Sequence, residues 1–94
     1  MKGYWVVRAS IRDAEEYGNY RELAGPVVAK FNGAFLSRGG LQEEVEGSGF
    51  ERTVLVEFNS YEEALSCYKS NDYQEALKHT KGSSNRLFSI VQGV

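Results

Sequence analysis

Four short stretches of the chain are rich in β-branched and aromatic residues, which is the composition of β-strands. They span residues 3–9, 34–38, 52–58 and 86–92. In the first stretch both alternating sets of side chains are largely apolar, which indicates a strand that is covered on two faces. We therefore expect four strands, of which 52–58, Arg-Thr-Val-Leu-Val-Glu-Phe, carries the strongest signal.

A helix is predicted between the first two strands, because apolar side chains recur there every three or four residues. These side chains are Tyr17, Tyr20, Ala24, Val28 and Phe31. Asp13, with Glu16 three residues later, resembles a capping box that starts this helix. Gly25-Pro26 falls inside it, and we expect the proline to kink the helix or divide it in two. Asn32-Gly33 ends the helix, with the glycine in the left-handed conformation.

A second helix is predicted between the last two strands, where Ser60 and Glu63 form another capping box. Apolar residues with helical spacing follow this cap, namely Tyr61, Ala64, Leu65 and Tyr68. Asn71 is expected to cap a further short helical segment. That segment carries Tyr73, Ala76 and Leu77 and ends before the Gly-Ser-Ser-Asn stretch at 82–85.

The predicted order is strand, helix, strand, strand, helix, strand, which is typical of the ferredoxin-like α+β fold in a single domain, 1–94. In this fold the sheet order is 4-1-3-2 with antiparallel neighbours, and both helices cover one face. Residues 41–46 are expected to form a short hairpin arm that turns at Gly47-Ser48-Gly49. The other face of the sheet is also apolar, and a second copy of the chain would cover it, so we expect a homodimer.

Composition excludes several classes of function. The formal charge is −2 and the pI is about 5.4, so nucleic acid is not a predicted partner. One cysteine, Cys67, and one histidine cannot form a structural zinc site, and we predict no metal and no cofactor. Neither a signal peptide nor an apolar run of membrane-spanning length is found, so we expect no membrane association and a cytoplasmic location.

Several short motifs occur in order along nearly the whole chain. They are Gly3-Tyr4-Trp5, Arg38-Gly39-Gly40, Glu57-Phe58-x-Ser60, Ala64-x-x-x-Tyr68-x-Ser70-x-x-Tyr73 and Gly93-Val94. Together they resemble the proteins of the family called domain of unknown function 1330. This resemblance implies membership of the dimeric α/β-barrel superfamily, whose members include cofactor-free monooxygenases, muconolactone-type isomerases and haem-dependent enzymes. It implies no particular reaction, because one fold hosts many chemistries.

Four arginines are predicted to lie at one end of the sheet, because the first two strands run one way and the last two run the other. They are Arg8, Arg38, Arg52 and Arg86. Clustered guanidinium groups bind carboxylates or phosphates, so a small organic anion is a predicted partner, with Arg8 and Arg38 as ligand-binding residues. Arg38 is the strongest candidate, since the two glycines after it permit close approach of the backbone. The alternative is that the arginines are solvated or pair with acidic residues, namely Asp13, Glu15, Glu51 and those of 43–46.

Tyr68, Tyr73 and His79 are expected near the same end. Trp5, Tyr68 and Tyr73 would hold an apolar or aromatic body, although helix-to-sheet packing is the alternative for the tyrosines. His79 is a candidate to shuttle a proton, because histidine is the side chain that exchanges protons near neutral pH. Glu57 interrupts an apolar strand towards the opposite end, where a half-buried carboxylate would act as a base or form hydrogen bonds within a dimer interface.

These residues lead to one main hypothesis and two alternatives. The main hypothesis is a cofactor-independent isomerase or monooxygenase that acts on a small aromatic or carboxylated metabolite. Arg38 would orient the anion, and His79 or Glu57 would move the proton. The first alternative is a non-catalytic metabolite-binding or stress-associated module. The second is a dimer that acts through partner contacts and has no pocket.

Overall fold

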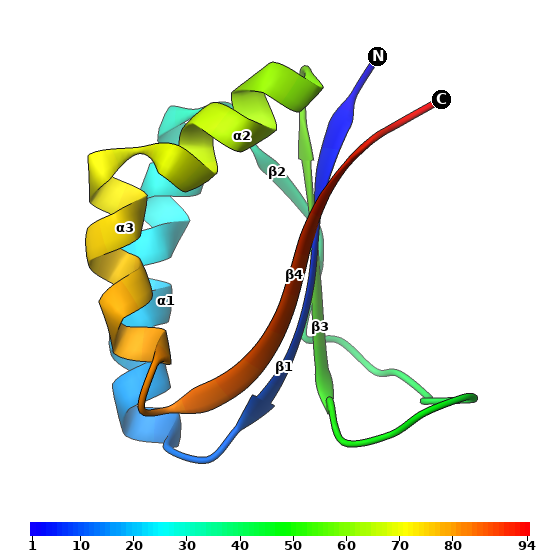
Figure 1. Ribbon diagram of the computed structural model, residues 1–94, viewed down its shortest axis with the longest axis vertical. Coiled ribbons are helices and arrows are strands. Elements are labelled where there is room, and N and C mark those ends of the chain that lie inside the picture. The colour runs from blue at the N-terminus through cyan, green and yellow to red at the C-terminus, as the bar shows by residue number, and fades with distance from the viewer.

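Four antiparallel strands form one sheet in the order β2-β3-β1-β4, and the helices lie on one of its faces (Figure 1). The computed structural model describes all residues, 1–94. Its elements are β1 (Gly3–Ile11), α1 (Ala14–Lys30), β2 (Ala34–Arg38), β3 (Arg52–Phe58), α2 (Tyr61–Lys69), α3 (Asn71–Leu77), a 3-10 turn (Lys78–Thr80) and β4 (Ser84–Gln92). The predicted ferredoxin-like fold and sheet order are therefore confirmed.

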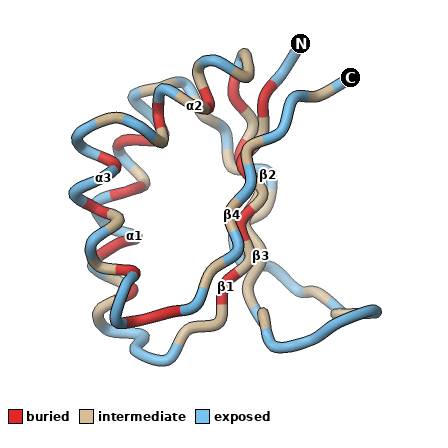
Figure 2. The backbone as a smooth tube through the Cα atoms, in the orientation of Figure 1, coloured by how far each residue is buried: buried red, intermediate tan, exposed pale blue.

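The core lies between the sheet and the helices, because side chains alternate across each strand. Along β1, Trp5, Val7 and Ala9 are buried beneath the helices, and the residues between them are only half-buried. Figure 2 shows the buried positions of β1, α1 and α3 facing the same interior. Trp5 is 2% exposed, and its indole N–H donates to the carbonyl oxygen of Ala64 at 2.9 Å, which ties β1 to α2.

Side-chain caps start the helices as the sequence indicates, with one exception. Asp13 accepts a hydrogen bond from the backbone N–H of Glu16, and Ser60 accepts one from Glu63, each at 3.1 Å. The cap of α3 is Ser70, which accepts from the N–H of Tyr73 at 3.2 Å, so the expectation for Asn71 is wrong by one residue. None of the helices is long and apolar enough to cross a membrane.

Helix α1 runs without interruption through Pro26, so the alternative of a divided helix is wrong. One of the clashes of a proline inside a helix is with the Cβ of the residue before it, and Gly25 has none. The left-handed residue after the helix is Asn32, with φ 60°, rather than Gly33. Asparagine tolerates this conformation, whereas Gly33 is needed for space, because a Cβ there would lie 2.7 Å from Val28 Cγ1.

The loop 39–51 leaves the sheet on the side away from the helices and has no strand in it, so the predicted hairpin arm is wrong (Figure 1). Glutamate and glycine are poor strand formers, and three like charges in 43–46 oppose close pairing. Side chains fasten the loop instead: Thr53 donates to Gln42 at 2.6 Å, and Glu44 accepts from the backbone N–H of Phe50 at 3.1 Å.

The face of the sheet that the helices leave open carries several exposed apolar side chains. Leu87 and Val91 of β4 lie on it and are 53% and 48% exposed, and Leu36 on β2 is 56% exposed. Leu55 of β3 pairs with Val6 of β1 on the same side. An exposed apolar area of this kind on a sheet is characteristic of an interaction surface.

Candidate functional site

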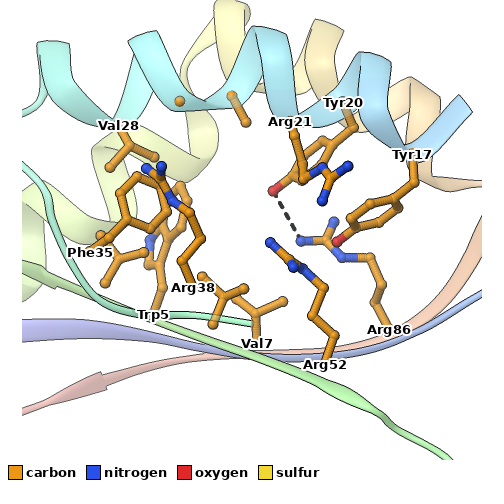
Figure 3. Close-up of a pocket in the computed structure, with 14 residues that line it drawn as sticks. Trp5, Val7, Tyr17, Tyr20, Arg21, Val28, Phe35, Arg38, Arg52 and Arg86 are labelled. Atoms are coloured by element: carbon orange, nitrogen blue, oxygen red, sulfur yellow. Dashed lines mark hydrogen bonds between the residues drawn. The ribbon is translucent and has the colours of Figure 1, made fainter. Parts of the chain in front are cut away.

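A pocket of about 240 Å³ lies between α1 and the sheet (Figure 3). Most of its lining is apolar, with Trp5, Val7 and Phe35 from the sheet and Ala24 and Val28 from the helix. Four arginines line it as well: Arg21, Arg38, Arg52 and Arg86. The lining contains no aspartate and no glutamate.

The register of the sheet brings Arg52 and Arg86 into the pocket. Both residues lie opposite Ala9 of the central strand, one on each side, so the three share a row on the helix-facing side. The methyl group of Ala9 leaves the space above this row to the two long side chains. Both arginines are half-buried, whereas Arg21 and Arg38 reach the pocket from exposed positions.

A β-bulge turns Arg38 towards the same pocket. Phe35 lies opposite Val56 and Arg38 opposite Val54, so two steps along β3 match three steps along β2, with an irregularity between Phe35 and Ser37. A regular strand would place residues 35 and 38 on opposite faces, and the extra residue restores them to one face. The Arg38 guanidinium carbon lies 3.6 Å from the centroid of the Phe35 ring, which is a close cation–π contact.

Aromatic rings hold Arg86 in place. Its guanidinium donates to the hydroxyl of Tyr20 at 3.1 Å and lies 4.7 Å from the Tyr20 ring and 5.3 Å from the Phe88 ring. Burial acts to lower the pKa of Arg86, but the hydroxyl oxygens of Tyr20 and Tyr73 outweigh it and raise the pKa above its ordinary value. The guanidinium therefore stays charged inside the pocket.

No carboxylate compensates these four charges. The ion pairs of the structure use Lys2, Arg8, Lys30, Lys78 and His79, and none of the pocket arginines. The Nε atoms of Arg52 and Arg86 are buried and have no hydrogen-bond partner. Like charges that converge on one pocket repel, and unpaired buried donors cost free energy. An anion bound among the guanidinium groups would relieve the repulsion between their charges.

Arg8 does not join this group. It lies one residue before Ala9, so its side chain is on the open face of the sheet, where it donates to Glu44 at 2.8 Å and to the carbonyl of Phe50 at 3.2 Å. Arg8 lines a second hollow, under residues 40–46, whose other charged groups are Glu43, Glu44 and Glu46. Here the alternative of an ion pair with the acidic loop is confirmed.

His79 and Glu57 lie outside the pocket and apart from each other. His79, on the 3-10 turn, contacts Glu16 of α1 at 2.7 Å, and this hydrogen bond, together with one from Asn19, holds the pKa of Glu16 below its ordinary value. Glu57 is on the open face of the sheet, where it accepts from the Tyr4 hydroxyl at 3.1 Å and raises the pKa of Tyr4. Neither of these predicted proton-transfer residues contacts the space that the arginines surround.

Tyr68 and Tyr73 pack behind the pocket rather than lining it. With Phe88 they form an aromatic cluster around Trp5, whose ring centroid lies 4.9 Å from that of Tyr73 and 6.4 Å from that of Tyr68. The Tyr73 hydroxyl shares a 2.7 Å hydrogen bond with Tyr20, and burial raises its pKa. Of the predicted ligand-binding residues, Trp5 and Arg38 therefore line the pocket, and the two tyrosines lie in the core.

Cys67 has the environment of a packing residue. It is 0% exposed in α2, and burial raises its pKa to about 12, so the thiol is uncharged at neutral pH and is no nucleophile. Cys67 therefore acts as a small hydrophobic side chain in the core.

The sequence interpretation missed several lining residues on α1 and β2, namely Tyr17, Tyr20, Arg21 and Phe35. A signal for Arg21 exists, because it follows Tyr17 by four residues and precedes Ala24 by three, at the border of the apolar face. A charged side chain at that border points towards the rim of whatever space the helix covers. No comparable signal exists for Phe35, whose direction depends on the bulge.

A comparison with known protein families finds one family that matches nearly the whole chain. Residues 2–94 match the family described as domain of unknown function (DUF1330). The chain belongs to the DUF1330 family. The family description names no reaction, so membership fixes ancestry and fold and leaves the chemistry to the site. A comparison with curated proteins finds no match for this DUF1330 chain.

Solved structures share the fold of this DUF1330 chain. A protein of unknown function from Rhodopseudomonas palustris superposes with a TM-score of 0.80 at 17% identity, covering 99% of this chain and 82% of that one. A dimeric ferredoxin-like protein of unknown function from Bacteroides fragilis gives 0.65 at 16% identity, with 98% and 96% covered. SnoaB, a cofactor-independent oxygenase from Streptomyces nogalater, gives 0.66 at 10% identity, with 99% and 93% covered. At these identities the likeness concerns the fold.

Proposed function

We propose that this protein binds a small carboxylated or otherwise anionic metabolite in the pocket between α1 and the sheet. The observation that carries the proposal is the group of four arginines without a carboxylate partner, set in an otherwise apolar lining. An apolar cavity with a few convergent polar groups is the usual form of a small-molecule site. The volume of about 240 Å³ fits a ligand smaller than a typical drug.

A cofactor-independent oxygenase or isomerase is the second candidate. The structural similarity to SnoaB supports it, as do the aromatic walls of Trp5 and Phe35, which suit a flat, conjugated substrate. The roles of His79 and Glu57 in proton transfer stay predictions, because both lie outside the lining. Binding is favoured over catalysis, since the lining offers only arginine and tyrosine as titratable groups.

We also propose that a second copy of the chain covers the open face of the sheet. Leu36, Leu87 and Val91 expose apolar surface on strands there, and the similar protein from Bacteroides fragilis is described as dimeric. The unpaired Cys67 fits the cytoplasmic location that we propose, because disulfides are rare in that compartment.

A thermal-shift titration with benzoate tests the binding proposal, using the wild type, Arg38→Met and Arg8→Met. Benzoate is expected to raise the unfolding midpoint of the wild type and of Arg8→Met, because a ligand that binds only the folded state stabilises it. Arg38→Met is expected to show a smaller rise. The absence of any rise with benzoate and related small carboxylates, or an equal rise in Arg38→Met, would argue against the proposal.

Light scattering after size-exclusion chromatography tests the dimer. The wild type is expected to elute with twice the chain mass, and Leu87→Glu with the mass of one chain, because a charge in an apolar interface opposes association. Glu22→Gln, on the exposed side of α1, is the control and is expected to stay dimeric. Ser89→Glu would not serve as a control, because Ser89 lies on the open face of the sheet with Leu87. A monomeric wild type at micromolar concentration would contradict the proposal.

A further inference from the structure

The two ends of the pocket differ in chemistry (Figure 3). Arg21, Arg52 and Arg86 lie towards one end and come from three elements, α1, β3 and β4. At the other end are the rings of Trp5 and Phe35, over one of which Arg38 is stacked. We call the first the three-arginine end and the second the aromatic end.

We propose that the three-arginine end binds the dianionic head group of a phosphate monoester, and that the organic body of the ester lies against Trp5 and Phe35 at the aromatic end. This inference rests on the proposed function and adds the chemical class of the head group to it.

The number and arrangement of the guanidinium groups favour a phosphate over a carboxylate. A carboxylate has two oxygens in one plane, and a single bidentate arginine engages both. A phosphate monoester has three terminal oxygens and a charge between about −1.5 and −2 at neutral pH. Arg52 and Arg86 approach from the sheet and Arg21 from the helix above it, so their donors surround a volume rather than a plane. Three cations that approach from two opposite sides match a tetrahedral dianion.

Unused donors at this end support the assignment. Arg86 uses one terminal nitrogen on the Tyr20 hydroxyl, which fixes the plane of its guanidinium. The side-chain hydrogen bonds that arginines donate in this protein come from Arg8, Arg12 and Arg86, so Arg21 and Arg52 keep their terminal N–H groups for a ligand. Arg52 also lies against Gly39, where a Cβ would come within 2.8 Å of its guanidinium carbon, so the chain keeps a glycine at the place where this arginine passes.

The aromatic end limits the organic body. The whole cavity holds about 240 Å³, below the range of roughly 300–1,000 Å³ for sites of drug-sized ligands. After a phosphate group is placed, the remaining space suits a single ring or a short chain. Phenyl phosphate therefore matches both ends and is the probe of choice, with benzoate as the carboxylate of similar size.

Isothermal titration calorimetry of the intact protein at pH 7.5 and pH 5.0 tests the inference, with phenyl phosphate, inorganic phosphate and benzoate as ligands. The second ionisation of a phosphate monoester occurs at about pH 6, so the ester is a dianion in the first buffer and a monoanion in the second. Benzoate keeps its single charge in both. We expect phenyl phosphate to bind at least tenfold more tightly than benzoate at pH 7.5, to lose most of this advantage at pH 5.0, and to be displaced by inorganic phosphate.

The protein itself does not change charge at this site between the two buffers. The groups that face the three-arginine end are Tyr17, Tyr20 and Arg21 from α1, Arg38 from β2, Arg52 from β3 and Arg86 from β4, with Tyr73 of α3 behind Tyr20. Tyrosine and arginine keep their protons throughout this range. The His79–Glu16 pair is outside the lining. A change with pH in the ratio of the affinities for phenyl phosphate and benzoate therefore reflects the charge of the ligand.

Two variants separate this inference from the proposed function. Arg52→Met is expected to remove the preference for phenyl phosphate, whereas Arg38→Met is expected to weaken both ligands and keep their ratio. Arg8→Met, on the open face, controls for the loss of one positive charge. Equal affinities for phenyl phosphate and benzoate in the wild type would overturn the inference and leave the proposed function standing. Binding of neither ligand would overturn both.

Discussion

Arg8 and Arg86 lie on adjacent antiparallel strands, at the same end of the sheet, yet they have opposite surroundings. Arg86 lies opposite Ala9, one residue after Arg8, so the two side chains point to opposite faces. On the open face, Arg8 pairs with Glu44 at 2.8 Å. On the helix-covered face, Arg86 has tyrosines around it and no carboxylate. One step of register separates a structural ion pair from a component of a candidate site.

The same difference separates Arg8 from the four arginines of the pocket. The chain places acidic residues in the loop beside Arg8 and none in the lining of the pocket that holds Arg21, Arg38, Arg52 and Arg86. Such an arrangement lowers the stability of the unliganded protein, because the charges repel and buried donors lack partners. Local conflict with the rules of stable packing is expected where a protein keeps a functional site.

A carboxylate placed on either side of β3 is the change with the largest expected effect. Val54 faces the pocket, opposite Arg38 and two residues from Arg52, whereas Leu55 faces the open side. Val54→Glu supplies an internal partner for the arginines and is expected to weaken anion binding roughly a hundredfold while the dimer persists. Leu55→Glu is expected to break the dimer and leave anion binding intact. Calorimetry and light scattering on both variants check this exchange, and a shared loss of both properties would contradict the separation of the two faces.

The glycines after Arg38 provide a smaller and more local test. Gly39 has φ +69°, and a Cβ on it would displace the Arg52 guanidinium. Gly39→Ala is expected to destabilise the protein by about 1 kcal/mol, because alanine is strained in the left-handed region. It is also expected to weaken anion binding roughly tenfold, as for one lost charge-assisted hydrogen bond.

Gly40→Ala is the matched control for this substitution. A Cβ at Gly40 meets no atom within 4 Å, so neither stability nor binding is expected to change. Denaturant unfolding and calorimetry on the two variants distinguish them. Equal anion affinities in Gly39→Ala and Gly40→Ala would show that the position of Arg52 does not matter for binding.

The smallest expected effect concerns pH and lies outside the pocket. Hydrogen bonds from His79 and Asn19 lower the pKa of Glu16 in the folded protein, and the N–H of Ile11 does the same for Glu51. A lowered folded pKa means that stabilisation is present above the unfolded value and is lost as the pH falls through the folded one. The Glu16→Gln variant is therefore expected to lose slightly less stability than the wild type between pH 5 and pH 3, as measured by thermal unfolding. A change in anion affinity in this variant would connect the His79 pair to the pocket.

The fold was accessible from the sequence because its signals are local and agree with one another. Strand composition, the caps at Asp13 and Ser60, and the order of elements all indicate the ferredoxin-like arrangement that the structure has. The expected hairpin arm is wrong because the loop is not held by a local pattern. Side chains such as Gln42 and Glu44 fasten it through hydrogen bonds, without a backbone ladder.

The candidate site was accessible only in part, because it depends on register. Topology alone brings Arg38, Arg52 and Arg86 to one end, and the structure places them in one pocket. The face of each side chain needs the alternation of the strands, and the bulge before Arg38 has no clear signature in the sequence. Tyr68 and Tyr73 have the helical spacing of pocket residues and core residues alike, and only packing distinguishes the two.

The unfolding free energies of Arg52→Met and Arg8→Met, measured at low ionic strength with and without phosphate, test the central claim most directly. If the pocket arginines are an uncompensated anion site, Arg52→Met is expected to be at least as stable as the wild type without phosphate and to lose the stabilisation that phosphate gives. Arg8→Met is expected to be less stable, by up to about 1 kcal/mol, and to keep that stabilisation. A destabilised Arg52→Met that still responds fully to phosphate would contradict the account.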